Sequence, residues 1–164
     1  MHETARAFIA TQAAAHGPFS SVLEIGSRNV NGSIREYFAG ADYLGVDLRA
    51  GDGVDVIGDT ADLWTTDERF DAIVCAEVFE HEPRWPSIVN KIATWLAPQG
   101  VVFLTMASTG REPHSGIDGG PVHPGELYQN ITPGELRLVL ESRGFQCDLD
   151  TSTPGDLYAV AWID

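Results

Sequence analysis

Residues 70–81 read Phe-Asp-Ala-Ile-Val-Cys-Ala-Glu-Val-Phe-Glu-His, an apolar run that stops at acidic residues and a histidine. The first part, Phe70–Ala76, is almost continuously apolar, which is typical of a strand buried on both faces. Strands of this kind belong to parallel sheets that carry helices on both sides. We therefore expect the polar residues after Ala76 at the carboxyl edge of such a sheet, where ligands bind in α/β folds.

Short apolar runs flank this segment on both sides. We expect further strands at residues 21–25, 43–47, 54–57, 101–106, 145–149 and 157–163. Helical patterns separate most of them, at residues 3–16, around 34–38, after Pro86, and from the capping box of Thr132 and Glu135. No helix separates the last two strands, so these can pair antiparallel.

The alternation predicts a three-layer, doubly wound, Rossmann-like α/β fold whose sheet is mostly parallel with an antiparallel C-terminal strand. The 164 residues fit a single domain that begins with a helix within residues 1–17. Residues 108–130 are rich in Gly, Pro and His and far exceed the usual connection of about 4–6 residues. We expect this long loop to overhang the carboxyl edge of the sheet.

The charge of the chain restricts its partners. Lys+Arg 10 against Asp+Glu 24 leaves a net charge of −14, and Lys91 is the only lysine. Because nucleic-acid binding depends on Lys and Arg neutralising phosphates, a nucleic-acid partner is disfavoured. No stretch reaches the roughly 18 apolar residues of a membrane span, and the first residues lack a secretory pattern. With Cys75 and Cys147 expected as free thiols, we predict a cytoplasmic protein; the sequence indicates no particular oligomeric state.

Three strand ends carry residues suited to a nucleotide-like ligand. Glu24–Ser27 leads through Gly32 toward a helix, and glycine lets the backbone approach a ligand. Asp47 ends the second strand, where a carboxylate can accept hydrogen bonds from ribose hydroxyls or cap the strand. Asp59 and Thr60 follow the third strand, where the carboxylate can accept from an adenine amino group, cap a helix, or do both.

Together with residues 70–81, these clusters resemble the class I S-adenosylmethionine-dependent methyltransferases, in particular the branch with an E-V-L-E-H segment after the fourth strand. The resemblance runs from about Val22 to Phe145 and includes Leu96–Gly100, similar to the family's L-x-P-G-G turn. It implies S-adenosylmethionine as cofactor and in-line methyl transfer to an oxygen or nitrogen of a small molecule. The family's E/D-x-G-x-G-x-G loop is altered here, because bulkier residues separate Gly26 from Gly32.

The resemblance assigns residues at four strand ends to the cofactor. Glu24 and Gly26 would line the methionine end of the cofactor, with Ser27 and Gly32 in the adjoining loop. Asp47 would hold the ribose, and Leu48 would pack on the adenine. Asp59 and Thr60 would meet the adenine edge, and Ala76 and Glu77 would lie beneath the cofactor.

Histidines are the candidates for a general base, because an imidazole titrates near neutral pH. The order of expectation is His81, His123 and then His114, although His81 could instead only fix the turn at Glu80–Pro83. His114, Tyr128 and Trp85 are expected in the acceptor pocket, with a core or rim position as the alternative for Tyr128 and Trp85.

No metal is expected from the sequence, because the spacing of His114, His123, Asp118 and Glu126 fits no strong ligand pattern. His2 and His16 are expected on the surface.

Absent motifs narrow the acceptor. The chain lacks an N/D-P-P-Y/F tetrad and a Pro-Cys pair, the marks of DNA amino- and cytosine methyltransferases. A small molecule or an exposed group on a macromolecule remains. Two other functions stay open: a methyltransferase-like domain that binds without catalysis, and an NAD-dependent oxidoreductase using Asp47 for ribose. The missing G-x-G-x-x-G fingerprint argues against the oxidoreductase.

Overall fold

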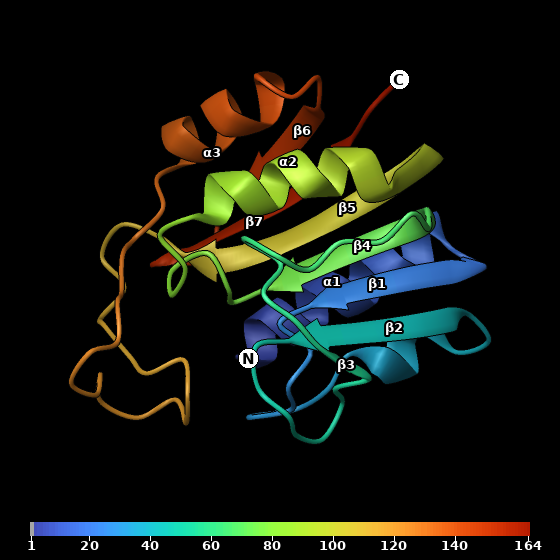
Figure 1. Ribbon diagram of the computed structural model, residues 1–164. Coiled ribbons are helices and arrows are strands. Elements are labelled where there is room, and N and C mark those ends of the chain that lie inside the picture. Colours follow the sequence, from blue (N-terminus) through green and yellow to red (C-terminus); the bar gives the residue numbers. More distant parts are fainter. Residues whose placement is uncertain (1) are drawn as a thin grey trace.

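The computed structural model describes residues 2–164 and contains a seven-stranded sheet in the order β3-β2-β1-β4-β5-β7-β6 (Figure 1). The strands are β1 (Ser21–Ile25), β2 (Asp42–Asp47), β3 (Val56–Ile57), β4 (Phe70–Ala76), β5 (Leu96–Ala107), β6 (Gln146–Asp150) and β7 (Asp156–Trp162). The helices are α1 (Glu3–His16), the 3-10 turn η1 (Arg35–Phe38), α2 (Trp85–Trp95) and α3 (Pro133–Glu141). Strands β1 to β5 pair in parallel, while β7 runs antiparallel to both β5 and β6. The predicted sheet is confirmed.

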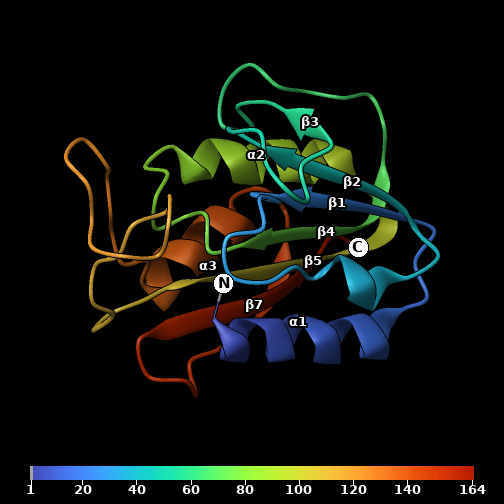
Figure 2. The same cartoon turned by 90° about the horizontal axis from the view of Figure 1, so that it is seen from below.

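Helices cover both faces of this sheet (Figure 2). Strand β4 lies in the middle and alternates between two hydrophobic cores. Ala72, Val74 and Ala76 pack on the side of α1 and η1, whereas Ile73 and Cys75 pack on the side of α2 and α3. Both faces of β4 are therefore apolar, which explains the continuous apolar run and confirms the three layers.

The capping box at the start of α3 is present. The side-chain oxygen of Thr132 accepts from the Glu135 backbone N–H at 3.2 Å, and Glu135 Oε2 accepts from the Thr132 N–H at 2.9 Å. A cap of this kind contributes about 1 kcal/mol to stability. It gives α3 a defined start directly after the long loop.

Two elements are smaller than expected, and one long connection contains no helix. The helix expected around 34–38 is only the turn η1, since the chain turns away at Gly40, whose φ is +91°. Strand β3 is shorter than the expected 54–57. Residues 58–69, between β3 and β4, contain no helix. Trp64 covers the sheet there instead, with its ring 4.9 Å from that of Trp95 in α2.

The carboxyl ends of β1, β2 and β4 meet at one edge of the sheet, as they must in a parallel arrangement. Residues 108–130 contain no helix or strand and lie beyond that edge (Figure 1). Within residues 2–164 no helix has the length and apolar character needed to cross a membrane.

Candidate active site

A cavity of ≈ 1010 Å³ lies at the carboxyl edge of the sheet. Its walls come from the ends of β1, β2 and β4, from the turn after β3, and from the long loop. Ligand pockets commonly measure about 300–1,000 Å³, so this one has room for a cofactor together with a small acceptor. Every residue that the sequence resemblance assigned to the cofactor lines it: Glu24, Gly26, Ser27, Gly32, Asp47, Leu48, Asp59, Thr60, Ala76 and Glu77.

Gly26 is required by packing as well as by its backbone conformation. Its φ is +79°, and a Cβ atom there would lie 2.3 Å from Val78 Cγ2. The backbone N–H groups of Gly26 and Ser27 both donate to the Val46 carbonyl, at 2.8 and 3.2 Å. The altered loop after β1 is therefore held against β2 and against the segment after β4. The close contact that glycine allows at this position is with other residues of the protein.

Ser27 offers a polar group that the protein itself leaves unused. Its side chain is buried, and within residues 2–164 its Oγ has no hydrogen-bond partner. Burying a hydroxyl without a partner costs free energy. A ligand or water in the cavity can supply that partner, so the residue fits the cofactor loop in which the resemblance places it.

Glu24 is a buried carboxyl at the end of β1. Its Oε2 accepts a hydrogen bond from the Tyr43 hydroxyl at 2.8 Å. Burial raises the pKa of Glu24 to about 7, while the Tyr43 hydrogen bond and the Arg35 charge act in the opposite direction. A cationic ligand group beside this carboxyl would offset the penalty of burying its charge. The ammonium at the methionine end of S-adenosylmethionine is such a group.

Asp47 is oriented by the backbone that follows it. Oδ2 accepts from the Arg28 N–H at 3.1 Å, and Oδ1 accepts from the Arg49 N–H at 3.0 Å. Each carboxylate oxygen can accept more than one hydrogen bond, so both retain capacity for the paired hydroxyls of a ribose. The neighbouring Leu48 is 59% exposed and lines the cavity, where it offers an apolar surface to a flat ring.

Asp59 holds a turn in place, and the helix-capping alternative does not apply because residues 58–69 contain no helix. Oδ1 accepts from the Ala61 N–H at 2.9 Å, and Oδ2 pairs with Arg84 Nη2 at 3.0 Å. An adenine amino group would therefore share the carboxylate with Arg84. Asp59 and Thr60 both line the cavity.

Glu77, directly after β4, has a strained backbone. Its φ is +57°, a conformation that costs a non-glycine residue roughly 1–2 kcal/mol. Its N–H donates to the Thr105 carbonyl at 2.8 Å, and the Thr105 hydroxyl donates to Glu77 Oε1 at 3.0 Å. Burial raises the pKa of Glu77. Strain of this kind is retained at functional sites, and here it aims a mostly buried carboxyl at the cavity.

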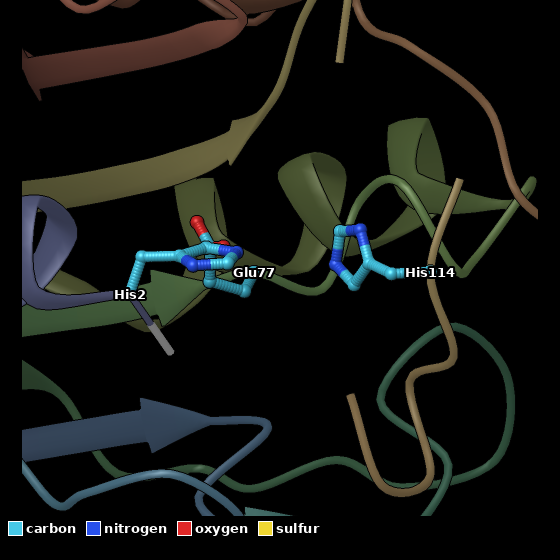
Figure 3. Close-up of side chains that lie close together, drawn as sticks. All are labelled: His2, Glu77 and His114. Carbon is cyan, nitrogen blue, oxygen red and sulfur yellow. The ribbon is translucent and has the colours of Figure 1, made fainter. Parts of the chain in front are cut away.

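Two histidines from separate segments converge on Glu77 (Figure 3). His2 comes from the N-terminal segment and His114 from the long loop, and one ligand atom of each residue lies within 4.8 Å of the others. His2 Nε2 is 3.8 Å from Glu77 Oε2 and also contacts Arg111. His2 was expected on the surface, and its side chain is exposed there while it also lines the cavity.

His81 and His114 both line the cavity. Their ring centroids are 5.0 Å apart, and both rings pack edge-on against Tyr128 at 5.6 and 5.1 Å. Burial lowers the pKa of His81 to about 4, aided by His114, and burial also lowers the pKa of His114. Both imidazoles are therefore neutral near pH 7, with lone pairs free to accept a proton or to bind a cation.

The structure separates three residues from the cavity lining. Trp85 is buried in the core and stacks on Phe79 at 5.1 Å, so we no longer assign it to the acceptor pocket. His123 is exposed and pairs with Asp118 at 2.9 Å, which raises the pKa of His123. That position does not suit the catalytic role expected for it. Tyr128 packs behind His81 and His114 and supports the acceptor side without lining it.

A parallel sheet with a cofactor-sized cavity at its carboxyl edge defines a Rossmann-like methyltransferase fold when β7 is inserted antiparallel beside β5, as it is here. The sequence matches the family described as "Methyltransferase domain" over residues 1–149. The chain belongs to this family, which confirms the resemblance seen in the sequence. No curated protein sequence matches the chain.

Solved structures with the same fold include several methyltransferases. A complex of DhpI with SAH is 24% identical and has a TM-score of 0.71, with 98% of this chain and 85% of that chain covered. The 1,6-didemethyltoxoflavin-N1-methyltransferase of Burkholderia thailandensis, with that compound and S-adenosylhomocysteine bound, is 19% identical at a TM-score of 0.74, covering 99% and 80%. The glycopeptide N-methyltransferase MtfA with sinefungin is 16% identical at 0.69, covering 98% and 94%.

Proposed function

We propose that this chain is an S-adenosylmethionine-dependent methyltransferase acting on a small-molecule acceptor. One observation carries the proposal: the residues assigned to the cofactor on four separate strand ends line one cavity, which His81 and His114 also line. Membership of the methyltransferase family supports the reaction. The similar structures include DhpI in complex with SAH or SAM and MtfA in complex with sinefungin, which supports the cofactor.

The cofactor would lie along the carboxyl edge, held by residues of the loops. Asp47 would accept from the ribose hydroxyls, Leu48 would pack on the adenine, and Glu24 would face the ammonium at the methionine end. When bound, S-adenosylmethionine supplies a methyl group that its positively charged sulfur already activates. The protein then has to place an acceptor atom in line with that methyl group and keep water out, and such positioning can supply about 7–11 kcal/mol.

The acceptor would bind between the end of β4 and the long loop. His81 and His114 line the cavity there, and Tyr128 packs behind both rings. Ser115 Oγ donates to Glu126 Oε1 at 3.0 Å, and Glu126 Oε2 accepts from the His123 N–H at 2.7 Å. The Gln129 N–H donates to the Glu80 carbonyl at 2.8 Å. These bonds give the loop a defined path over the acceptor side.

A small acceptor agrees with the names of similar proteins, which include a 1,6-didemethyltoxoflavin-N1-methyltransferase and a glycopeptide N-methyltransferase. The net charge of −14 continues to disfavour nucleic acid. The cytoplasmic location expected from the sequence stays a prediction.

The test has two parts. Calorimetric titration with S-adenosylhomocysteine measures the cofactor site, and release of S-adenosylhomocysteine from S-adenosylmethionine is then followed across a panel of small alcohols, phenols and amines. Binding together with acceptor-dependent release supports the proposal. Binding without transfer to any acceptor class would favour a domain that binds without catalysis, and failure to bind would overturn the cofactor assignment.

A further inference from the structure

Glu80, His81 and His114 form a second cluster on the acceptor side of the cavity. One carboxylate oxygen and one ring nitrogen from each histidine lie within 4.8 Å of one another. Glu80 and His81 follow β4, whereas His114 comes from the long loop, so the cluster depends on the tertiary fold. The spacing of histidines along the chain does not reveal this cluster. His123 is the histidine nearest to His114 in the sequence, but it pairs with Asp118 and takes no part in the cluster.

The protein leaves part of this cluster without partners. Glu80 is 0% exposed, and its Oε1 accepts from the Ala107 N–H at 3.2 Å. Its Oε2 and the Tyr128 hydroxyl are both buried, and neither has a hydrogen-bond partner within residues 2–164. A buried carboxyl oxygen left in this state is costly, since such groups are otherwise paired, hydrogen-bonded or bound to a metal. A ligand in contact with Glu80 would remove the cost.

The charges around the cluster favour a positive ligand. Glu77 adds a second carboxyl beside the cluster, since one of its oxygens lies within 4.8 Å of a ring nitrogen of His114. His81 and His114 each contribute one ring nitrogen to the cluster. Arg111 is the nearby fixed cation, and its charge is paired with the buried Asp156 at 3.0 Å. Metal ions in proteins bind imidazole nitrogens and carboxylate oxygens, and a carboxyl group gives up its proton when it binds the ion, so the cluster offers both kinds of ligand.

We propose that Glu80, His81 and His114 bind a divalent transition-metal cation of the Zn²⁺ or Mn²⁺ class beside the acceptor. Two imidazole nitrogens and one carboxylate oxygen suit such ions, whereas Mg²⁺ and Ca²⁺ favour sites made mainly of oxygen. Three protein ligands leave a coordination position open, as catalytic metal sites do. Because His81 and His114 line the cavity, that position faces the space for the acceptor.

This inference rests on the proposed function and makes it more specific, because a cation at this place favours an acceptor that carries a hydroxyl. A divalent cation lowers the pKa of an oxygen bound to it. The hydroxyl proton would leave to water, the oxygen would bond to the methyl carbon, and the carbon–sulfur bond would break with its electron pair remaining on sulfur. The cation thereby replaces the general-base role expected for His81, whose ring nitrogen it occupies.

The experiment uses the full-length chain without a histidine tag, stripped with a chelator and dialysed against Zn²⁺, Mn²⁺ or Co²⁺ alone. We expect about one ion per chain, as one such site requires, and a visible Co²⁺ spectrum typical of nitrogen and oxygen ligands. His114→Ala and Glu80→Gln should each weaken binding by at least the roughly 10–100-fold that loss of a supporting partner costs. His123→Ala, an exposed histidine of the same loop, is the matched control and should bind as the unaltered protein does.

Titration with S-adenosylhomocysteine in the same metal-free proteins separates the two proposals. Cofactor binding without metal binding would overturn the metal site and leave the proposed function standing. Metal binding without cofactor binding would overturn the proposed function. Binding that survives His114→Ala, or that is lost in His123→Ala, would also overturn the site. Because His114 lies on a loop and its replacement leaves the core intact, this variant decides the question even where Glu80→Gln disturbs folding.

Discussion

Gly26 and Val78 both line the cavity and lie so close together that a Cβ atom on Gly26 would be 2.3 Å from Val78 Cγ2. The contact joins the loop after β1 to the segment that carries Glu77 and His81. Glycine at this position therefore sets the spacing between the cofactor loop and the acceptor wall. The loop was expected to need glycine for the approach of a ligand, and the structure adds a reason that lies within the protein.

Gly26→Ala should destabilise the fold more than a positive φ alone explains. The left-handed conformation costs alanine about 1–2 kcal/mol, and forcing a methyl group against Val78 adds roughly 1–3 kcal/mol. Gly40→Ala is the matched control, because Gly40 has φ +91° and nothing within 4 Å of an added Cβ. Urea unfolding of both variants measures the difference, and equal losses would show that the loop moves away from Val78 at no cost.

Stability should fall with rising pH through Glu24. Its folded-state pKa is about 7 against an ordinary value of 4.5, so the folded state retains a proton that the unfolded state loses. This retained proton contributes up to roughly 3 kcal/mol to the free energy of unfolding. The contribution is complete below pH 4.5 and is lost as the pH rises to about 7. Glu24→Gln should gain stability relative to the unaltered protein across that window. Glu3→Gln, an exposed replacement on α1, should show no such gain in stability. An effect of Glu24→Gln that does not change with pH would contradict the raised pKa of the buried Glu24 carboxyl.

Asp47→Ala should weaken binding of S-adenosylhomocysteine by about 1.5–3 kcal/mol, the scale of hydrogen bonds to a charged group. The control is Asp42→Ala, an exposed aspartate at the other end of β2. Calorimetric titration of both variants reports the affinities. An unchanged affinity for Asp47→Ala would mean that the ribose lies elsewhere in the cavity.

Arg111→Met should destabilise the protein by about 1–3 kcal/mol, because it leaves the buried Asp156 carboxylate without its charged partner at 3.0 Å. The Tyr158 hydroxyl, which donates to Asp156 Oδ2 at 2.9 Å, remains. Arg137→Met removes the exposed pair with Glu141 on α3 and should cost no more than about 0.5 kcal/mol. Thermal unfolding compares the stability of the two variants. Similar small losses of stability would show that the buried Asp156 carboxylate does not need a charged partner.

Strand ends could be predicted from the sequence because they follow apolar runs whose period is unambiguous. Asp47, Asp59 and Glu77 each come directly after such a run, and a parallel sheet brings their ends to one edge. Trp85 was placed in the pocket although Ile88, Val89 and Ile92 follow it at helical spacing. That pattern was the available signal for a core position.

The path of the long loop could not be predicted in this way, because it has no periodicity. His114 and His123 are equivalent in the sequence, yet one faces the cavity and the other bonds Asp118 on the surface. His2 reaches the cavity only because α1 packs across the sheet with its start near the end of β4 (Figure 2). The Glu80 cluster arises from the same folding of distant segments.

Thermal unfolding with S-adenosylhomocysteine, S-adenosylmethionine and NAD in parallel tests the central claim most directly. A ligand present at 100 times its dissociation constant stabilises the folded state by about 2.7 kcal/mol, which a melting curve resolves. The two adenosyl ligands should raise the melting temperature, and NAD should leave it unchanged. A shift with NAD alone, or no shift with either adenosyl ligand, would contradict an S-adenosylmethionine site in this cavity.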